Sequence, residues 1–262
     1  MSDVQAVPAT ARSVPYSVVK SAPMTVIACA YTPEGFVVGA DGLRVDATTH
    51  QDITHTAQKI FPVRHSDFYG IHAWAGATWL FSLGSGPFVA AEEAQSAINE
   101  LSERPITSLA TYVADIGSLI YDRLVAYNRG TKLLNPNVVS KNNEIFCGMF
   151  VGYLRGHAWM IQISFPHENG VLLPPVLNKI CEAPNEFCMF SASKLVWFDI
   201  QATVFEPQSL TEAADLVQRY VQLCVNKRYE YEDCKNMGGH IHLAAISPEE
   251  FSWIVPPKES IA

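Results

Sequence analysis

The first patterned part of the chain is a pair of short apolar runs that flank a turn. Residues 26–31 and 36–40 are mostly apolar, with several β-branched or aromatic side chains, and this composition favours strands. Between them, Pro33 presets its own φ angle and Gly35 permits the positive φ that closes a tight turn. The pattern predicts an antiparallel hairpin, which returns Asp41 to the start of the first strand.

Strand patterns recur after this hairpin and again in the second half of the chain. A polar segment at residues 42–58 is expected to be a loop with one short strand. Apolar, aromatic and β-branched runs predict further strands at residues 59–63, 68–74, 144–154, 157–165, 170–173, 187–190, 240–246 and 251–255. Arg155-Gly156 marks a tight turn between two of these strands.

Helical patterns form two blocks between the strands. Gly84-Ser85-Gly86-Pro87 reads as a helix entry with Pro at the first helical position, and predicts a helix that ends near residue 102. Residues 107–128 keep apolar positions three and four apart, and a third helix is expected at residues 194–203. The capping box Ser209-Leu-Thr-Glu212 opens a fourth. Strands, two helices, strands, two helices and strands indicate an α+β layered sandwich.

Length and hydrophobic content predict one large domain, because 262 residues with 48% hydrophobic content can bury a full core. We place this domain at residues 25–257, with a short tail at residues 258–262. Residues 1–24 contain three prolines and no charged stretch followed by an apolar core, which disfavours a secretory signal. Two interpretations stay open for this segment, a flexible leader and a removable propeptide.

Charge and cysteine usage exclude several classes of function. The formal net charge is −8 and no run of Lys or Arg occurs, which disfavours nucleic-acid and anionic-membrane partners. The six cysteines are scattered and form no CxxC pair, as expected for reduced thiols in a cytoplasmic protein without a metal site. No apolar run is long enough to cross a bilayer.

Several residues that attract notice also have ordinary structural explanations. Thr25 and Asp41 fit a simple hairpin, since Thr favours strands and Asp often precedes Gly in a turn. His240 and His242 alternate on one predicted strand, and without a third ligand we expect a packed or surface pair. Cys29 is expected to be a core residue rather than a nucleophile.

Four short motifs, taken in order, carry a resemblance to a known family. They are Thr25, Gly39-Ala40-Asp41, Gln58-Lys59-Ile60 and Ala75-Gly76-Ala77. Together with the closing helix and hairpin, they resemble the proteasome-type N-terminal nucleophile (Ntn) hydrolases, which include the 20S proteasome beta subunits. The resemblance covers nearly the whole domain, and it implies a four-layer αββα sandwich of two antiparallel sheets between helix layers.

The resemblance also implies a threonine-type peptidase with a defined role for each residue. The Thr25 hydroxyl would attack the peptide carbonyl, and the α-amine of the same residue, with an ordinary pKa of roughly 7.7–8.0, would accept its proton. A charged Lys59, held in place by Asp41, would lower the pKa of that amine by repulsion. The N–H of Gly76 would bind the oxyanion that forms on attack.

Two further site residues and a set of partners follow from the same resemblance. Ser191 would be an auxiliary residue beside the amine, and Asp233 a further acid at the site. The family implies peptides or unfolded proteins as substrates, self-association into homo-oligomeric rings, and an ATP-dependent unfoldase as a partner. The chemistry needs no cofactor and no metal.

The chain departs from the family pattern in three places. Met24 stands before Thr25 where self-processing members have Gly, so the threonine would be exposed either by cleavage or by translation from Met24. The family's Arg two residues after the Asp is Leu43 here, with Arg44 next to it. Asp233-Cys-Lys-Asn-Met-Gly-Gly lacks the serine of the family's late motif. A catalytically inactive structural ring subunit and a related small-amide amidase therefore stay open as alternatives.

Overall fold

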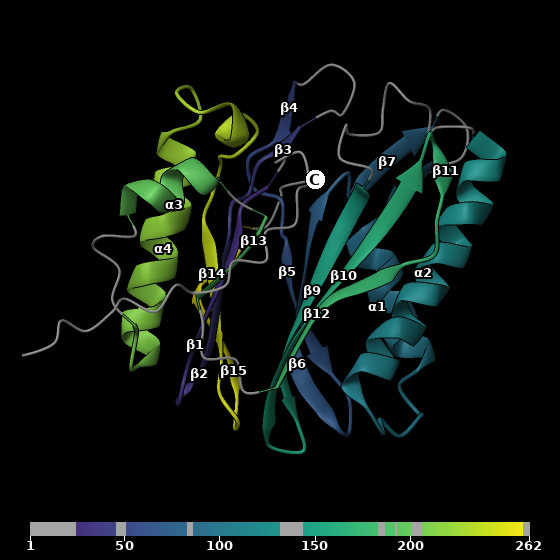
Figure 1. Ribbon diagram of the computed structural model, residues 1–262, viewed down its shortest axis with the longest axis horizontal. Helices are drawn as coiled ribbons and strands as arrows, with labels where there is room; N and C mark the ends of the chain where they lie inside the picture. The colour runs from purple at the N-terminus through teal and green to yellow at the C-terminus, as the bar shows by residue number, and fades with distance from the viewer. Residues whose placement is uncertain are drawn as a thin grey trace, which may run out of the picture.

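A computed structural model describes residues 25–45, 51–82, 86–131, 144–182, 187–191, 193–200 and 206–258. Across the view of Figure 1, two helices, one sheet, a second sheet and two more helices follow one another. All strand pairs in both sheets are antiparallel among the described residues. The expected α+β class with antiparallel sheets is therefore confirmed.

The first sheet contains the opening hairpin and the closing hairpin side by side. Its strands, in spatial order, are β13 (Phe187–Ser191), β1 (Ile27–Thr32), β2 (Gly35–Ala40), β14 (His242–Ile246) and β15 (Phe251–Val255). The central strands β1 and β2 are apolar at nearly every position, because they are covered on both faces. Helices α3 (Lys194–Ile200) and α4 (Leu210–Asn226) pack on the outer face of this sheet.

The second sheet is built around the long strands of the middle of the chain. Its strands are β11 (Val171–Leu172), β10 (His157–Glu168), β9 (Glu144–Leu154), β6 (Phe68–Gly76) and β5 (Ile60–Arg64), with β12 (Val176–Glu182) also paired to β10. Helices α1 (Ala90–Glu100) and α2 (Leu109–Thr131) cover the outer face. Between the two sheets lies a separate apolar cluster that includes Ile27 and Phe36 from one sheet and Ile71 and Val151 from the other.

Two small hairpins lie outside these sheets, and one of them corrects a sequence prediction. They are β3 (Arg44–Val45) with β4 (Asp52–Thr54), and β7 (Trp79–Ser82) with β8 (Gly86–Val89). The helix predicted to open at Pro87 begins only at Ala90, since Pro87 belongs to β8 and lies opposite Phe81. Both strands of a two-stranded ribbon are edge strands. Pro87 is tolerated there, because a backbone nitrogen that faces solvent does not need to donate a hydrogen bond.

Other local predictions agree with the structure in detail. Arg155 and Gly156 have positive φ angles of 51° and 83°, as a tight two-residue hairpin turn requires. Ser209 caps α4 by accepting a hydrogen bond from the Glu212 N–H at 3.3 Å. The Glu212 carboxylate accepts instead from the N–H of Gln208, one residue before the expected partner.

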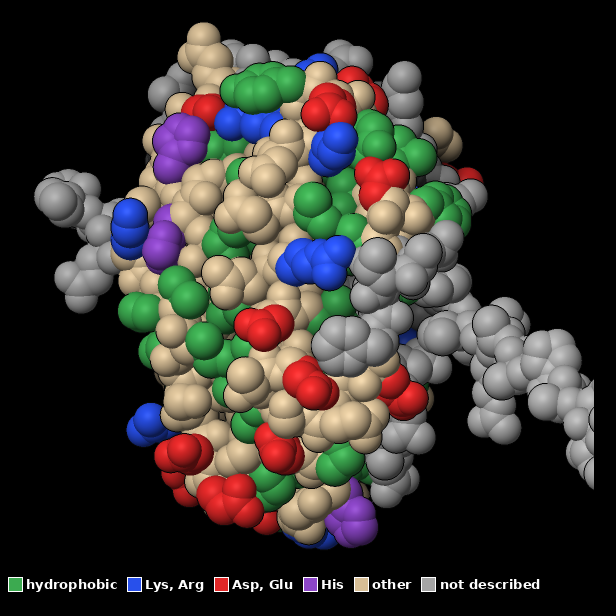
Figure 2. Space-filling model, turned by 90° about the vertical axis from the view of Figure 1, so that its left-hand side faces the viewer, with side chains coloured by type: hydrophobic (Ala, Val, Ile, Leu, Met, Phe, Trp, Pro, Cys, Tyr) green, Lys and Arg blue, Asp and Glu red, His purple; other side chains and the backbone are tan. Residues whose placement is uncertain are grey.

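The outer surfaces of the described helices are mixed in character. Figure 2 views the α3–α4 side and shows hydrophobic side chains scattered among charged and polar ones. The large exposed apolar side chains on this side include Leu195 and Phe198 of α3. No described helix is both long and apolar enough to cross a membrane.

Candidate active site

Asp41, immediately after β2, is completely buried and surrounded by hydrogen-bond donors. Its Oδ1 accepts from Lys59 Nζ at 2.8 Å and from the Val26 N–H at 2.9 Å. Its Oδ2 accepts from the Gly238 N–H at 2.9 Å and from the Leu43 N–H at 3.3 Å. Four donors on two oxygens fix the orientation of the carboxylate.

Lys59 immediately precedes β5 and joins the two sheets at this point. Its ammonium binds Asp41 at the end of the first sheet, and its backbone N–H donates to Nε2 of His242 on β14 at 3.1 Å. Burial lowers the pKa of Lys59, the Asp41 charge opposes that shift, and the Arg44 charge adds to it. Burial, followed by the Lys59 charge, lowers the pKa of His242 to about 4, so this ring is neutral and accepts the N–H.

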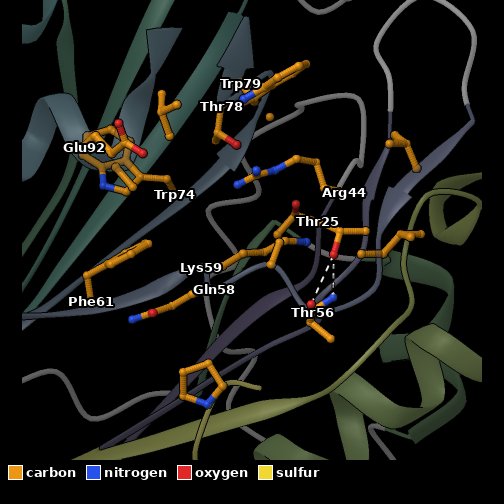
Figure 3. A pocket seen from close by; sticks show the side chains of 18 of the residues that line it. Thr25, Arg44, Thr56, Gln58, Lys59, Phe61, Trp74, Thr78, Trp79 and Glu92 are labelled. Atoms are coloured by element: carbon orange, nitrogen blue, oxygen red, sulfur yellow. Dashed lines mark hydrogen bonds between the residues drawn. The ribbon is translucent and has the colours of Figure 1, made fainter. Parts of the chain in front are cut away.

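Thr25 lies two residues before β1 and lines a cavity of about 470 Å³, to which β5, β6 and α1 also contribute residues. Lys59 and Gly76 line the same cavity, and only 4% of Thr25 and 8% of Lys59 are exposed. Figure 3 shows Thr25 and Lys59 at one end of the cavity and Trp74 and Glu92 toward the other. The hairpin, the start of β5 and the end of β6 therefore bring these three sequence-predicted residues together.

Gly76 ends β6 in a backbone conformation that favours glycine. Its φ angle is +99°, and a Cβ atom there would lie 2.8 Å from both the Ile145 carbonyl oxygen and Phe146 Cα. A side chain at this position would be strained and would force β6 away from β9. Glycine is thus required for the strand end that faces the cavity.

The two remaining predicted site residues are placed differently. Ser191 ends β13, and its backbone pairs with Ile27, two residues after Thr25; its side chain lies outside the described part of the structure. Asp233 lies in the 3-10 helix η2 (Glu232–Cys234) and is not among the residues that line the cavity. The structure therefore does not bring Asp233 into the cavity that Thr25 lines.

The sequence did not assign several other residues to the site. Gly238 donates to Asp41 and His242 accepts from Lys59, although each lies more than 180 positions away from its partner. Arg44 and Glu92 enter the cavity from β3 and α1. Among the residues that the structure describes, no group of three His, Cys, Asp or Glu side chains is arranged to hold a metal ion.

The arrangement is chemically suited to activating a small nucleophile. The buried Lys59 side chain lines the same cavity as Thr25, and its counterion Asp41 is held by backbone donors. The cavity is large enough for one amino-acid side chain and part of a backbone. These features favour reactions in which a hydroxyl attacks a carbonyl group.

Comparison with known proteins finds structures of similar fold but no matching sequence family. No family model and no curated protein sequence match this chain. Solved structures similar to it include the Anbu (Gly-1) mutant from Hyphomicrobium sp. strain MC1, with a TM-score of 0.56, 15% identity, and coverage of 90% of this chain and 89% of that chain. Anbu (ancestral beta-subunit) from Yersinia bercovieri has a TM-score of 0.55 and 13% identity, with 88% and 87% covered. The likeness shows the fold alone.

Proposed function

We propose that this chain is a threonine peptidase of the N-terminal nucleophile type, which hydrolyses peptide bonds through an acyl-enzyme on Thr25. The observation that carries the proposal is the buried ion pair of Lys59 and Asp41, 2.8 Å apart, at the end of the cavity that Thr25 lines. Buried ion pairs rarely stabilise a fold more than apolar residues of similar volume would. A role in chemistry therefore explains its presence better than a role in stability.

The proposed mechanism assigns each step to a group of this chain. Once Thr25 is the first residue, its α-amine takes the hydroxyl proton while the hydroxyl oxygen forms a bond to the substrate carbonyl carbon. The Lys59 ammonium repels a proton from that amine, and the N–H of Gly76 stabilises the oxyanion. The leaving amine departs with a proton, and water then hydrolyses the ester on Thr25.

Asp41 contributes through position rather than through proton transfer. It holds the Lys59 ammonium and also accepts from the N–H of Val26, the residue that follows Thr25. One carboxylate thus fixes both the ammonium and the backbone that carries the nucleophile. Pre-organisation of this kind lowers the barrier because no rearrangement is needed during the reaction.

The likeness to the Anbu structures supports the wider assignment, which we propose with the mechanism. Residues 25–257 form one domain with the four-layer αββα arrangement, residues 1–24 are a leader or propeptide, and residues 258–262 are a tail. The chain assembles into homo-oligomeric rings in the cytoplasm, acts on peptides or unfolded proteins, and works with an ATP-dependent unfoldase. Ser191, whose backbone pairs with Ile27, assists at the amine. Asp233 does not line the cavity, so its part in this proposal is limited to an indirect one.

A catalytically inactive ring subunit is the second candidate. The observation that favours it concerns the late motif, where Asp233 does not line the cavity. Such a subunit would keep residues 1–24 and would have no free amine on Thr25. A small-amide amidase is the third candidate, and it would differ only in the length of substrate that it accepts.

Paired substitutions of Thr25 distinguish these candidates. Thr25→Ser keeps a hydroxyl, and Thr25→Val keeps the shape without it. We expect the protein to hydrolyse short peptide amides, the Ser variant to retain part of the rate, and the Val variant to lose at least about a thousandfold. Hydrolysis of single amino-acid amides alone would favour the amidase. Ring assembly in native mass spectrometry without any hydrolysis would establish the structural subunit, and unchanged hydrolysis by Thr25→Val would contradict the nucleophile.

A further inference from the structure

The cavity beside Thr25 carries an uneven set of charges. Among the residues that the structure describes, four charged side chains line it: Arg44, Lys59, Glu92 and Lys258. Lys59 is neutralised by Asp41 at 2.8 Å. Two cations and one anion remain, so the cavity is locally positive in a chain whose formal net charge is −8.

Arg44 and Glu92 differ in how strongly their charges act on a molecule in the cavity. Arg44 is partly buried and forms no ion pair with a carboxylate of the described residues, whereas Glu92 is solvent-exposed in the first turn of α1. Burial lowers the pKa of Arg44, and the charge of Glu92, which lines the same cavity, opposes this in part. A guanidinium that has lost water without gaining a carboxylate binds an incoming anion strongly, while water screens an exposed carboxylate.

Figure 3 shows that the Arg44 side chain extends from β3 across the cavity, with its nitrogen atoms directed toward the side of Trp74 and Glu92. The guanidinium therefore lies over the space that a substrate side chain would enter once its carbonyl faces Thr25. Because guanidinium presents parallel N–H donors, it matches the two oxygens of a carboxylate.

Trp74 and Phe61 form an apolar floor of the cavity, and their contacts with His72 hold both rings in place. The Trp74 indole N–H donates to Nδ1 of the fully buried His72 at 2.7 Å, and the His72 ring stacks on Phe61 with centroids 5.2 Å apart. Trp74 and Phe61 line the cavity themselves. An apolar floor lets the CH₂ groups of a side chain pack while its charged end turns toward Arg44.

We infer that the cavity selects peptides by an acidic side chain, glutamate in particular, on the residue whose carbonyl faces Thr25, and that Arg44 is the residue that recognises it. The two methylenes of glutamate reach past the nucleophile to the guanidinium, and Lys258 at the rim adds to the attraction. The inference rests on the proposed function for its orientation, since Thr25 defines which carbonyl is presented.

Binding to the Thr25→Val variant tests the inference apart from catalysis. Four acetylated tripeptide amides, Ala-Ala followed by Glu, Gln, Leu or Lys, are titrated into the variant by NMR, and their dissociation constants are compared. We expect the Glu peptide to bind at least about tenfold more tightly than the Gln peptide, which has the same shape without the charge.

Two substitutions added to this variant give opposite expected results. Arg44→Met, with Arg44→Lys as a version that keeps the charge, should reduce the Glu/Gln preference to near one and to a few-fold, respectively. Glu92→Gln, the matched change across the cavity, should leave the preference intact or raise it about twofold, because it removes a repelling charge. Thermal unfolding of each variant identifies any that fails to fold.

The outcomes separate this inference from the peptidase proposal. A Glu preference that depends on Arg44, in a protein that hydrolyses nothing, supports the inference and rejects the peptidase. Hydrolysis without a Glu preference supports the peptidase and overturns the inference. Tighter binding of the Leu or Lys peptide, an unchanged preference in Arg44→Met, or no binding of any of the four peptides would also overturn it.

Discussion

Two regions of the molecule bury polar groups in contrasting ways. At the junction of the sheets, Asp41 and Lys59 form an ion pair at 2.8 Å, and each oxygen of Asp41 accepts two hydrogen bonds. Within the second sheet, His72 and Glu144 are also buried, but burial lowers the pKa of His72 to about 3 and raises the pKa of Glu144 to about 7. The buried carboxylate that backbone N–H groups surround is thus Asp41, and the cavity lined by its partner Lys59 and by Thr25 adjoins it.

The largest expected loss of stability is that of Asp41→Asn, which leaves the Lys59 ammonium buried without its counterion. Removing one partner of a buried pair costs about 3–5 kcal/mol of unfolding free energy, and we expect a loss in this range by urea denaturation. Asp52→Asn is the matched control, since Asp52 pairs with Arg228 at 2.7 Å in a partly exposed ion pair and should cost less than about 1 kcal/mol. Equal losses in the two variants would contradict the contrast.

Acid should destabilise both regions, because each contains a buried histidine that is neutral in the folded protein and must be protonated at low pH. The folded pKa of His242 is about 4 and that of His72 about 3, both below the ordinary value of 6.5. A depressed pKa contributes stability that is present above pH 6.5 and is lost as the pH falls toward the folded pKa. Each histidine should therefore cost about 3 kcal/mol of unfolding free energy between pH 6.5 and 4.

Single variants test these two contributions separately. Denaturation between pH 4 and 7 is followed in the wild type, His242→Gln and His72→Gln, and each variant should lose about half of the pH dependence. A wild-type stability that stays level over this range would show that the rings are not held neutral in the folded protein.

Glu144 should change the unfolding free energy in the opposite direction, at alkaline pH, and by less than the two histidines together. Burial raises its pKa from 4.5 to about 7, so the stability that it contributes is present below pH 4.5 and is lost as the pH rises through 7. Glu144→Gln should therefore raise the unfolding free energy at pH 8 by about 3 kcal/mol relative to its effect at pH 4.5. Glu168→Gln, at an exposed position near the end of β10, should show no such difference. An effect of Glu144→Gln that is equal at both values of pH would contradict this.

Sequence predicted the part of the site that depends on neighbours in the chain. An antiparallel hairpin must return Asp41 to the start of β1, and its contact with the Val26 N–H follows from that geometry. The placement of Gly238 and His242 could not be predicted in this way, because it depends on β14 pairing with β2 across the sheet. Sequence spacing says nothing about that lateral order.

Local patterns also failed where two elements share the same signal. Gly86-Pro87 is typical of a helix start, yet the segment pairs with β7 and the helix begins at Ala90. Strand β12 was not predicted, because Pro174 and Pro175 precede it and half of its apolar side chains are exposed. Arg44 stood out only as a departure from a family pattern, and its position in the cavity required the structure.

The account depends most directly on the state of one bond, between Met24 and Thr25. Intact-mass measurement of the purified full chain, and of a chain whose translation starts at Met24, determines the first residue of each. We predict that at least one of them begins at Thr25, which provides the free amine that the proposed mechanism uses. If every molecule of both proteins retains Met24, no such amine exists, and the threonine peptidase account is contradicted.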